Sequence, residues 1–92
     1  MKLGKVLKVF RTSTGISALE MHRITGFSRS YISSIENDQR KGISMRVLEK
    51  YAEVCGVKPS KILCIQEDSE EFNWDERTVH VKVLKTLYPS DD

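Results

Sequence analysis

Hydrophobic positions recur at helical spacing from the first residues of the chain onward. Near the N-terminus, apolar residues fall at i, i+3, i+4 and i+7, at Leu3, Val6, Leu7 and Phe10. This pattern predicts an amphipathic helix that ends before Gly15. No stretch before residue 66 alternates between apolar and polar residues as a half-buried strand would. The first two thirds of the chain are therefore predicted to be helical.

Start and stop signals separate the next two predicted helices. Ser17 and Glu20 have the spacing of a capping box, in which each side chain satisfies a backbone N–H group of the other residue. Gly26 follows about two turns later, and Ser28 has the position of a second N-cap. Two short helices joined at one glycine predict a tight corner, which glycine permits because it adopts positive φ without strain.

Residues 29–37 are predicted to form a third helix with two contrasting faces. Ile32 and Ile35 form its apolar face. The opposite stripe has the spacing i, i+3, i+4 and i+7 and contains only short polar residues: Ser30, Ser33, Ser34 and Asn37. A helix with such a stripe exposes a surface that can approach a partner closely.

Two further helices are predicted after a polar loop at residues 38–42. Ser44 is placed to cap the fourth helix, whose apolar stripe ends at Cys55. Pro59 suits the first turn of a helix because that position needs no N–H donor, and it begins a short fifth helix through Leu63. The sequence thus predicts an all-α domain of five helices.

The last third of the chain supports two interpretations. Residues 67–71 are mostly acidic and predict a linker, which follows a domain at residues 1–65 and belongs to a C-terminal extension at residues 66–92. A helix is favoured beyond the linker because one helical seam collects four large residues, Trp74, Val81, Leu84 and Tyr88. A strand is the alternative, because residues 79–83 alternate strictly between β-branched and polar side chains.

Charge is distributed unevenly between these two parts. Residues 1–65 hold twelve Lys and Arg against five Asp and Glu, a balance of +7, whereas residues 66–92 hold three against eight, a balance of −5. The whole chain carries a formal charge of +2. A basic domain attracts the phosphate backbone of nucleic acids, so this pattern is compatible with a nucleic-acid partner without specifying one.

The remaining residues argue against several classes of protein. Cys55, Cys64, His22 and His80 are too few and too scattered to supply the clustered ligands of a zinc site. No nucleophile motif or glycine-rich phosphate loop points to an enzyme. No apolar run approaches the ~20 residues that span a bilayer, and the N-terminus lacks a signal-peptide core. We expect a cytoplasmic protein without cofactor, metal or membrane association, and with both thiols reduced.

Residues 17–36, SALEMHRITGFSRSYISSIE, resemble the helix-turn-helix of Cro/CI-type (Xre-family) regulators. The likeness rests on the capped second helix, the corner glycine Gly26, the serine cap Ser28 and the two inward isoleucines. Local similarity extends to SinR-type repressors. The resemblance covers about residues 3–65 and implies a five-helix, lambda-repressor-like DNA-binding domain with a C-terminal extension.

The resemblance places the helix at residues 29–37 in the major groove of double-stranded DNA. That groove is about 12 Å wide and admits one helix, and short side chains let the helix approach the base edges. Arg29 begins the helix, where its guanidinium can bond guanine O6 and N7. The residues expected to contact bases are Arg29, Ser30, Ser33 and Ser34. Those expected to contact phosphate are Ser17, Ser28, Tyr31, Asn37, Gln39, Arg40 and Lys41.

Arg11 and Glu36 are expected to be structural despite their charges. The matching residues of similar proteins form an ion pair between the first and third helices, and the resemblance implies the same pair here. Removing one partner of a buried pair leaves an uncompensated charge in the interior. Glu36→Ala is therefore expected to impair folding more than it impairs DNA contact directly.

The function implied is a sequence-specific transcriptional regulator, a repressor by expectation, that binds a palindromic operator as a homodimer. Two-fold pairing would place two recognition helices one DNA turn apart, ~34 Å. The candidate dimer residues are the apolar ones of the C-terminal segment, Trp74, Val81, Val83, Leu84, Leu87 and Tyr88. The alternatives are that this segment folds back on its own domain or binds another protein.

Other physiological roles are left open by the sequence. A restriction-modification controller or an antitoxin-type autoregulator would use the same DNA-binding module. An alternative of another class is a protein-interaction module that keeps the fold without reading DNA. The polar and basic character of the predicted recognition stripe favours DNA, because a pure adaptor would be free to carry acidic or apolar residues there.

Overall fold

A computed structural model describes residues 1–90 of the chain, which contain six α-helices and no strand. The helices are α1 (Leu3–Ser13), α2 (Ala18–Thr25), α3 (Arg29–Glu36), α4 (Met45–Cys55), α5 (Pro59–Glu71) and α6 (Glu76–Leu87). The all-α fold is confirmed. The first five helices begin close to the positions that the caps and apolar stripes predicted.

Local signals account for the corner between α2 and α3. The Ser17 hydroxyl accepts a bond from the Glu20 backbone N–H at 3.0 Å, and the Glu20 carboxylate accepts one from the Ser17 N–H at 3.4 Å. Ser28 caps α3 by accepting a bond from the Tyr31 N–H at 3.1 Å. Gly26 has φ of 79°, the left-handed conformation that the sequence predicted. These contacts fix where α3 starts.

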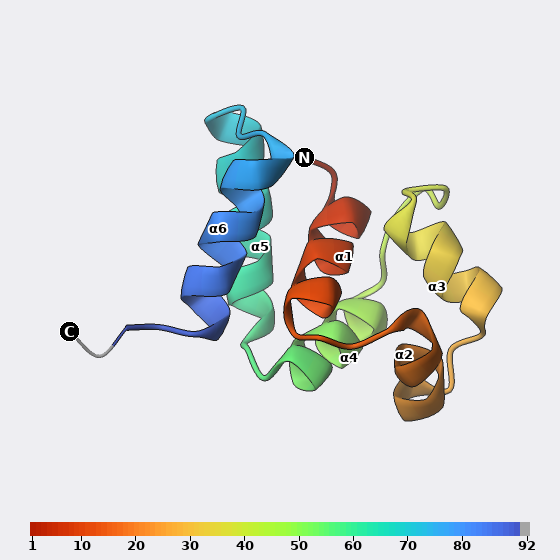
Figure 1. The fold of residues 1–92 in the computed structure, drawn as a ribbon. Helices are drawn as coiled ribbons and strands as arrows, with labels where there is room; N and C mark the ends of the chain where they lie inside the picture. Colours follow the sequence, from red (N-terminus) through yellow and green to blue (C-terminus); the bar gives the residue numbers. More distant parts are fainter. Residues whose placement is uncertain (91–92) are drawn as a thin grey trace.

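Helix α1 occupies the centre of the fold and contacts α3, α4, α5 and α6. Figure 1 shows α5 and α6 on one side of α1 and α3 on the other, so that α3 lies at the edge of the molecule. The core is built around α1 and α4; its largest fully buried side chains include Leu7, Phe10, Met21, Ile32 and Tyr51. One face of α3 is held by this core and the other is left open.

The acidic segment at residues 67–71 is not a linker, so that prediction was wrong. It forms the last turns of α5, which continues to Glu71. The helix persists because Ile62, Ile65 and Ser69 form a buried stripe along it, while Glu67, Glu70 and Glu71 are exposed and Asp68 is half-buried. The run of charge is the solvated face of a longer helix.

Residues 76–87 form helix α6, as favoured, and the alternative strand is wrong. The predicted apolar seam of Trp74, Val81, Leu84 and Tyr88 lies mainly on the face of α6 that points away from α1 and α5. Val79 and Val83 are fully buried against the rest of the chain, and α6 packs on α1 and α5. Val83, predicted as a dimer residue, is therefore used within the chain itself. Val81, Leu84 and Tyr88 remain exposed.

The structure also places the two thiols. Cys55 is buried, and burial raises the pKa of its thiol; Cys64 is exposed, and neither thiol is in a disulfide. Within residues 1–90, no three His, Cys, Asp or Glu side chains converge where they could hold a metal ion. None of the helices described is both long and apolar enough to cross a membrane.

Candidate nucleic-acid interface

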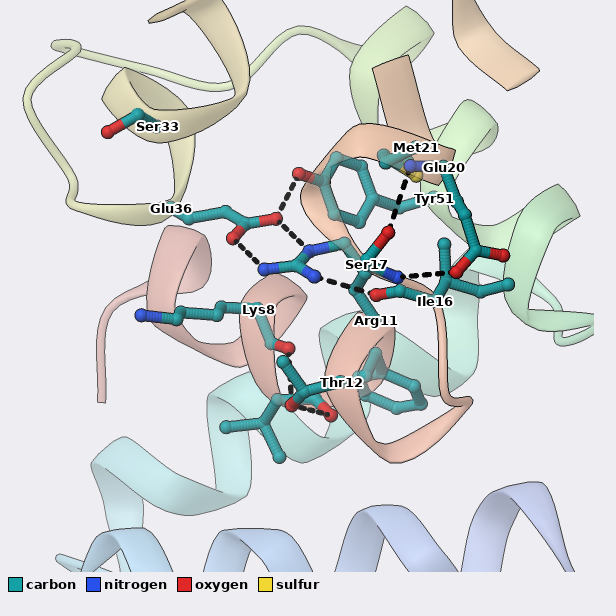
Figure 2. Close-up of polar contacts among 12 residues, drawn as sticks. Lys8, Arg11, Thr12, Ile16, Ser17, Glu20, Met21, Ser33, Glu36 and Tyr51 are labelled. Carbon is teal, nitrogen blue, oxygen red and sulfur yellow. Dashed lines mark hydrogen bonds and ion pairs between the residues drawn. The ribbon is translucent and has the colours of Figure 1, made fainter. Parts of the chain in front are cut away.

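The outward face of α3 carries three of the four residues predicted to contact bases. Arg29, Ser30 and Ser33 are all exposed. No acidic side chain is exposed between residues 28 and 34. In Figure 2 the Ser33 side chain points away from the buried contacts made by the other face of the helix. This face therefore offers short polar groups and one cation to a partner.

Ser34, the fourth predicted base contact, differs from the other serines. Its side chain is half-buried, and its hydroxyl donates to the Tyr31 carbonyl oxygen at 2.7 Å. The Ser34 hydroxyl oxygen also accepts a bond from Arg40 Nε at 3.0 Å. The predicted polar stripe is thus divided, because the Ser34 hydroxyl already has two partners within the chain.

The C-terminal end of α3 is anchored by a buried ion pair. Arg11 Nε and Nη2 donate to the two Glu36 carboxylate oxygens, each at 2.8 Å, and the Tyr51 hydroxyl donates to Glu36 Oε2 at 2.5 Å. Arg11 Nη1 also donates to the Ile16 carbonyl oxygen at 2.7 Å. Figure 2 shows these contacts converging between α1, α3 and α4. Every charged atom of the pair is compensated, as burial requires.

The pKa values of this cluster follow from its contacts. Hydrogen bonding to Glu36 raises the pKa of the Arg11 guanidinium above its ordinary value, so Arg11 stays charged. Burial, reinforced by the bond to Glu36, raises the pKa of the Tyr51 hydroxyl well above its usual range. Tyr51 is therefore a neutral hydrogen-bond donor, and the cluster holds one positive and one negative charge.

A second anchor joins the other end of α1 to the loop after α3. The Asp38 carboxylate accepts bonds from the backbone N–H groups of Gly4 at 2.9 Å and Lys5 at 3.2 Å. These are first-turn donors of α1 that have no partner within the helix. Gly4 lies so close to α3 that a Cβ atom there would be 2.0 Å from the Ile35 carbonyl oxygen. Sequence reasoning missed this cap, which joins residues 34 positions apart.

A cavity of about 590 Å³ lies beside the N-terminal half of α3 and contains a residue that the sequence did not single out. Arg40 and Arg46 both line it, together with the rings of Phe27 and Tyr31. The Arg40 guanidinium lies 4.3 Å from the Tyr31 ring centroid, and that of Arg46 lies 5.9 Å from the Phe27 ring centroid. Arg46 follows the Ser44 cap, a signal that predicts a helix start but not a basic site.

A second hollow of about 430 Å³ flanks the opposite side of α3. Lys8 and Ala18 line it beside Arg29 and Ser33. Lys8, on α1, is an exposed cation that the sequence analysis did not single out. Basic side chains therefore stand on both flanks of the outward face.

The other residues predicted to contact phosphate lie around this face, and they differ in whether their polar groups already have partners within the chain. Asn37, Gln39 and Lys41 are exposed in or near the loop after α3, and Asn37 Nδ2 donates to Ser33 Oγ at 3.1 Å. The hydroxyls of Ser17 and Ser28 are exposed but already accept the capping bonds of α2 and α3. Their helix N-termini remain the groups able to attract an anion.

Comparisons with known proteins agree with this arrangement. A family described as helix-turn-helix matches residues 7–62. The HTH-type transcriptional regulators SinR of Bacillus licheniformis and of Bacillus subtilis (strain 168) are each 31% identical over 68 residues, which cover 74% of this chain and 61% of the relative. The chain thus spans less than two thirds of the length of these relatives. No solved structure gives a significant match. The chain belongs to the helix-turn-helix family, as its resemblance to Cro/CI-type regulators predicted.

Proposed function

We propose that this protein binds double-stranded DNA sequence-specifically by inserting α3 into the major groove. The observation that carries the proposal is the outward face of α3, where Arg29, Ser30 and Ser33 are exposed on a helix whose other face is anchored in the core. A rigid helix with short polar side chains can approach base edges closely. Arg29 would discriminate guanine through two bonds, and the two serines would contact neighbouring bases.

The phosphate contacts would frame this helix on both sides. Lys8 stands on one flank, and Arg40, Lys41 and Arg46 stand on the other. Phosphate contacts fix the register of a protein on the duplex, and base contacts then select the sequence. The N-termini of α2 and α3 would add backbone N–H donors.

The biological role we propose is transcriptional regulation, specifically repression. The support is the pair of SinR proteins named above, which are HTH-type transcriptional regulators. Because the chain covers 61% of each relative, the proposal takes from them only the role of the shared module. A DNA-binding domain that occupies an operator represses simply by excluding other proteins from it.

We further propose that the protein binds a palindromic site as a homodimer through the outer face of α6. Val81, Leu84 and Tyr88 have the spacing of one helical stripe and are 44%, 37% and 61% exposed, and the Tyr88 hydroxyl donates to the Ser13 carbonyl oxygen at 3.3 Å. Trp74 and Leu87, also predicted for the interface, are half-buried at its margins. A second copy would cover this stripe, and two-fold symmetry would present two α3 helices to one duplex.

Selection of bound duplexes from a random pool tests DNA recognition. We expect an enriched palindromic motif whose half-sites are about 10–10.5 base pairs apart, centre to centre. Arg29→Ala should lose the preference for guanine at one position of each half-site, at a cost of ~1–3 kcal/mol per bidentate contact. Lys61→Ala, at an exposed basic residue of α5, is the control and should select the wild-type motif. A pool that never enriches would overturn the proposal.

Sedimentation equilibrium without DNA tests the dimer. Leu84→Asp should convert a dimer into a monomer, because it places a charge in the apolar stripe without touching the core. Leu19→Asp on α2 is the control, since Leu19 is 39% exposed and Leu84 is 37% exposed. A wild-type chain that stays monomeric across the concentration range would contradict the homodimer and favour a different protein as the partner of α6.

A further inference from the structure

The two arginines of the cavity beside α3 support a more specific assignment. We propose that Arg40 and Arg46 form a clamp for one phosphodiester group of the bound duplex, and that Tyr31 and Ser34 are positioning residues for Arg40 that do not contact DNA. This inference rests on the proposed function and changes the roles that the sequence predicted for two residues. Ser34 was expected to read a base, and Tyr31 was expected to contact phosphate through its hydroxyl.

Arg40 is held in place from two directions. Its guanidinium carbon lies 4.3 Å from the centroid of the Tyr31 ring, and its Nε donates to Ser34 Oγ at 3.0 Å. These contacts leave the two terminal nitrogens of Arg40 without a hydrogen-bond partner among residues 1–90. A guanidinium fixed through its inner nitrogen and its flat face presents its outer N–H groups as a fork that matches phosphate oxygens.

The Ser34 hydroxyl is unsuited to reading a base. Its single proton is donated to the Tyr31 carbonyl oxygen at 2.7 Å, and one lone pair accepts the bond from Arg40. A serine hydroxyl has one donor and two acceptor sites, so Ser34 could offer DNA only one acceptor. Ser30 and Ser33 are exposed on the same helix, and neither hydroxyl accepts a bond from Arg40.

Arg46 lines the same cavity and has no ion-pair partner among residues 1–90. It lies in the first turn of α4, where the positive end of the helix dipole disfavours a cation. Its guanidinium is 5.9 Å from the Phe27 ring, and Phe27 meets Tyr31 edge to face at 5.3 Å. One aromatic pair therefore supports both arginines.

The electrostatics of the cavity favour an anion. No carboxylate lines it, and none of the ion pairs within residues 1–90 includes Arg40 or Arg46. The capping serines Ser28 and Ser44 also line it, which brings the N-termini of two helices to the same space. The cavity adjoins the start of α3, so a duplex bound by the outward face would bring its own phosphates to this position.

The salt dependence of duplex binding tests the clamp. Affinity for the selected duplex is measured over a range of salt concentrations for the wild type, for Arg40→Ala/Arg46→Ala and for the control Lys61→Ala. Loss of one phosphate contact should reduce the slope of log K against log[salt] by about 0.9 in magnitude and leave the preferred sequence unchanged. The control should keep the wild-type slope.

Binding of inorganic phosphate distinguishes a free phosphate ion from a DNA phosphodiester as the ligand of the cavity. Saturable binding of inorganic phosphate by the DNA-free protein, together with a wild-type salt slope in the double variant, would assign the cavity to a free phosphate and overturn the proposal. A wild-type chain that selects no sequence would instead overturn the proposed function. Normal selection with an unchanged slope in the double variant would remove the clamp alone.

Two smaller substitutions test the positioning roles. Tyr31→Phe keeps the ring and should bind like the wild type, whereas a phosphate contact through the hydroxyl would make it bind more weakly. Ser34→Ala should weaken binding about two- to tenfold, the range for one hydrogen bond, without changing the selected sequence. That effect should vanish when Arg40 is already alanine. A changed base preference in Ser34→Ala would restore Ser34 as a base contact and contradict its positioning role.

Discussion

The inner and outer faces of α3 differ in how completely their polar groups are used. On the inner face, Glu36 is 5% exposed and accepts three hydrogen bonds from Arg11 and Tyr51. On the outer face, Arg29 and Ser30 are exposed, and the Arg29 guanidinium has no hydrogen-bond or ion-pair partner among residues 1–90. The same eight-residue helix therefore combines a fixed surface with an available one.

This difference separates stability from binding along a single element. A substitution on the inner face changes interactions that already exist in the free protein, so it changes the free energy of unfolding. A substitution on the outer face removes groups that are solvated in the free protein, so it changes affinity and leaves folding almost unaltered. Each prediction below tests that separation, beginning with the largest effect.

Glu36→Ala should lower the free energy of unfolding by about 3–5 kcal/mol, because it leaves the Arg11 charge buried without its carboxylate. Domains of this size have roughly 5–15 kcal/mol in total, so the variant should be close to unfolding. Urea denaturation followed by circular dichroism measures the loss. Glu49→Ala on α4, at an exposed glutamate, is the control and should stay within about 0.5 kcal/mol of the wild type.

Gly4→Ala should destabilise the fold by about 1–3 kcal/mol, although alanine is the better helix former by ~1 kcal/mol. The added Cβ would meet the Ile35 backbone oxygen at 2.0 Å, which forces α1 and α3 apart because backbone cannot rotate away. Gly42→Ala is the matched control, since nothing lies within 4 Å of its Cβ position. Equal melting temperatures for the two variants would contradict the close contact between α1 and α3.

Stability should fall as pH rises above about 10, in part because of Tyr51. Its pKa is raised in the folded chain, whereas a tyrosine of the unfolded chain loses its proton near pH 10. Above that pH the unfolded state binds fewer protons than the folded state, so the free energy of unfolding decreases. Burial raises the pKa of Cys55 as well, which adds a loss that begins near pH 9.

The contribution of Tyr51 can be isolated by comparing pH profiles of urea denaturation. Tyr51→Phe should be less stable at neutral pH, because it lacks the bond to Glu36, and should show a shallower decline above pH 10. Cys55 is unchanged in both proteins and so cancels in the comparison. Parallel profiles for the two proteins would show that Tyr51 is not buried beside the ion pair.

Ser33→Ala should have the smallest effect on folding, within about ±0.5 kcal/mol. Ser33 is exposed, and its hydroxyl accepts only the bond from Asn37 Nδ2. Its consequence should instead be a changed preference at one base position, measured by selection from the random pool. A destabilisation comparable to that of Glu36→Ala would contradict the distinction between the two faces.

Much of the fold could be predicted because its signals are local. The capping box at Ser17 and Glu20 and the left-handed corner at Gly26 are fixed by residues within one or two turns of each other. The Asp38 cap on α1 could not be found in this way, because an aspartate in a polar loop gives no indication of which distant helix it caps. The ion pair between Arg11 and Glu36 was expected only from the family resemblance.

The errors of sequence reasoning arose where one pattern has two physical readings. Acidic residues 67–71 fit either a linker or the solvated face of a helix, and only the buried positions of Ile65 and Ser69 decide between them. On α6, the seam with the larger apolar residues faces outward, while Val79 and Val83 are buried against the chain. Arg46 was missed because its role depends on the Phe27 ring, which only the fold brings beside it.

Amide chemical-shift mapping of the selected duplex tests most directly which face of the protein binds DNA. The largest shifts should fall at residues 28–34 and in the loop at residues 38–42, whereas the amides of α6 should move little on addition of duplex to the dimer. The account would be contradicted if the amide shifts were concentrated on α6, or if the amides of α3 did not shift on addition of the selected duplex.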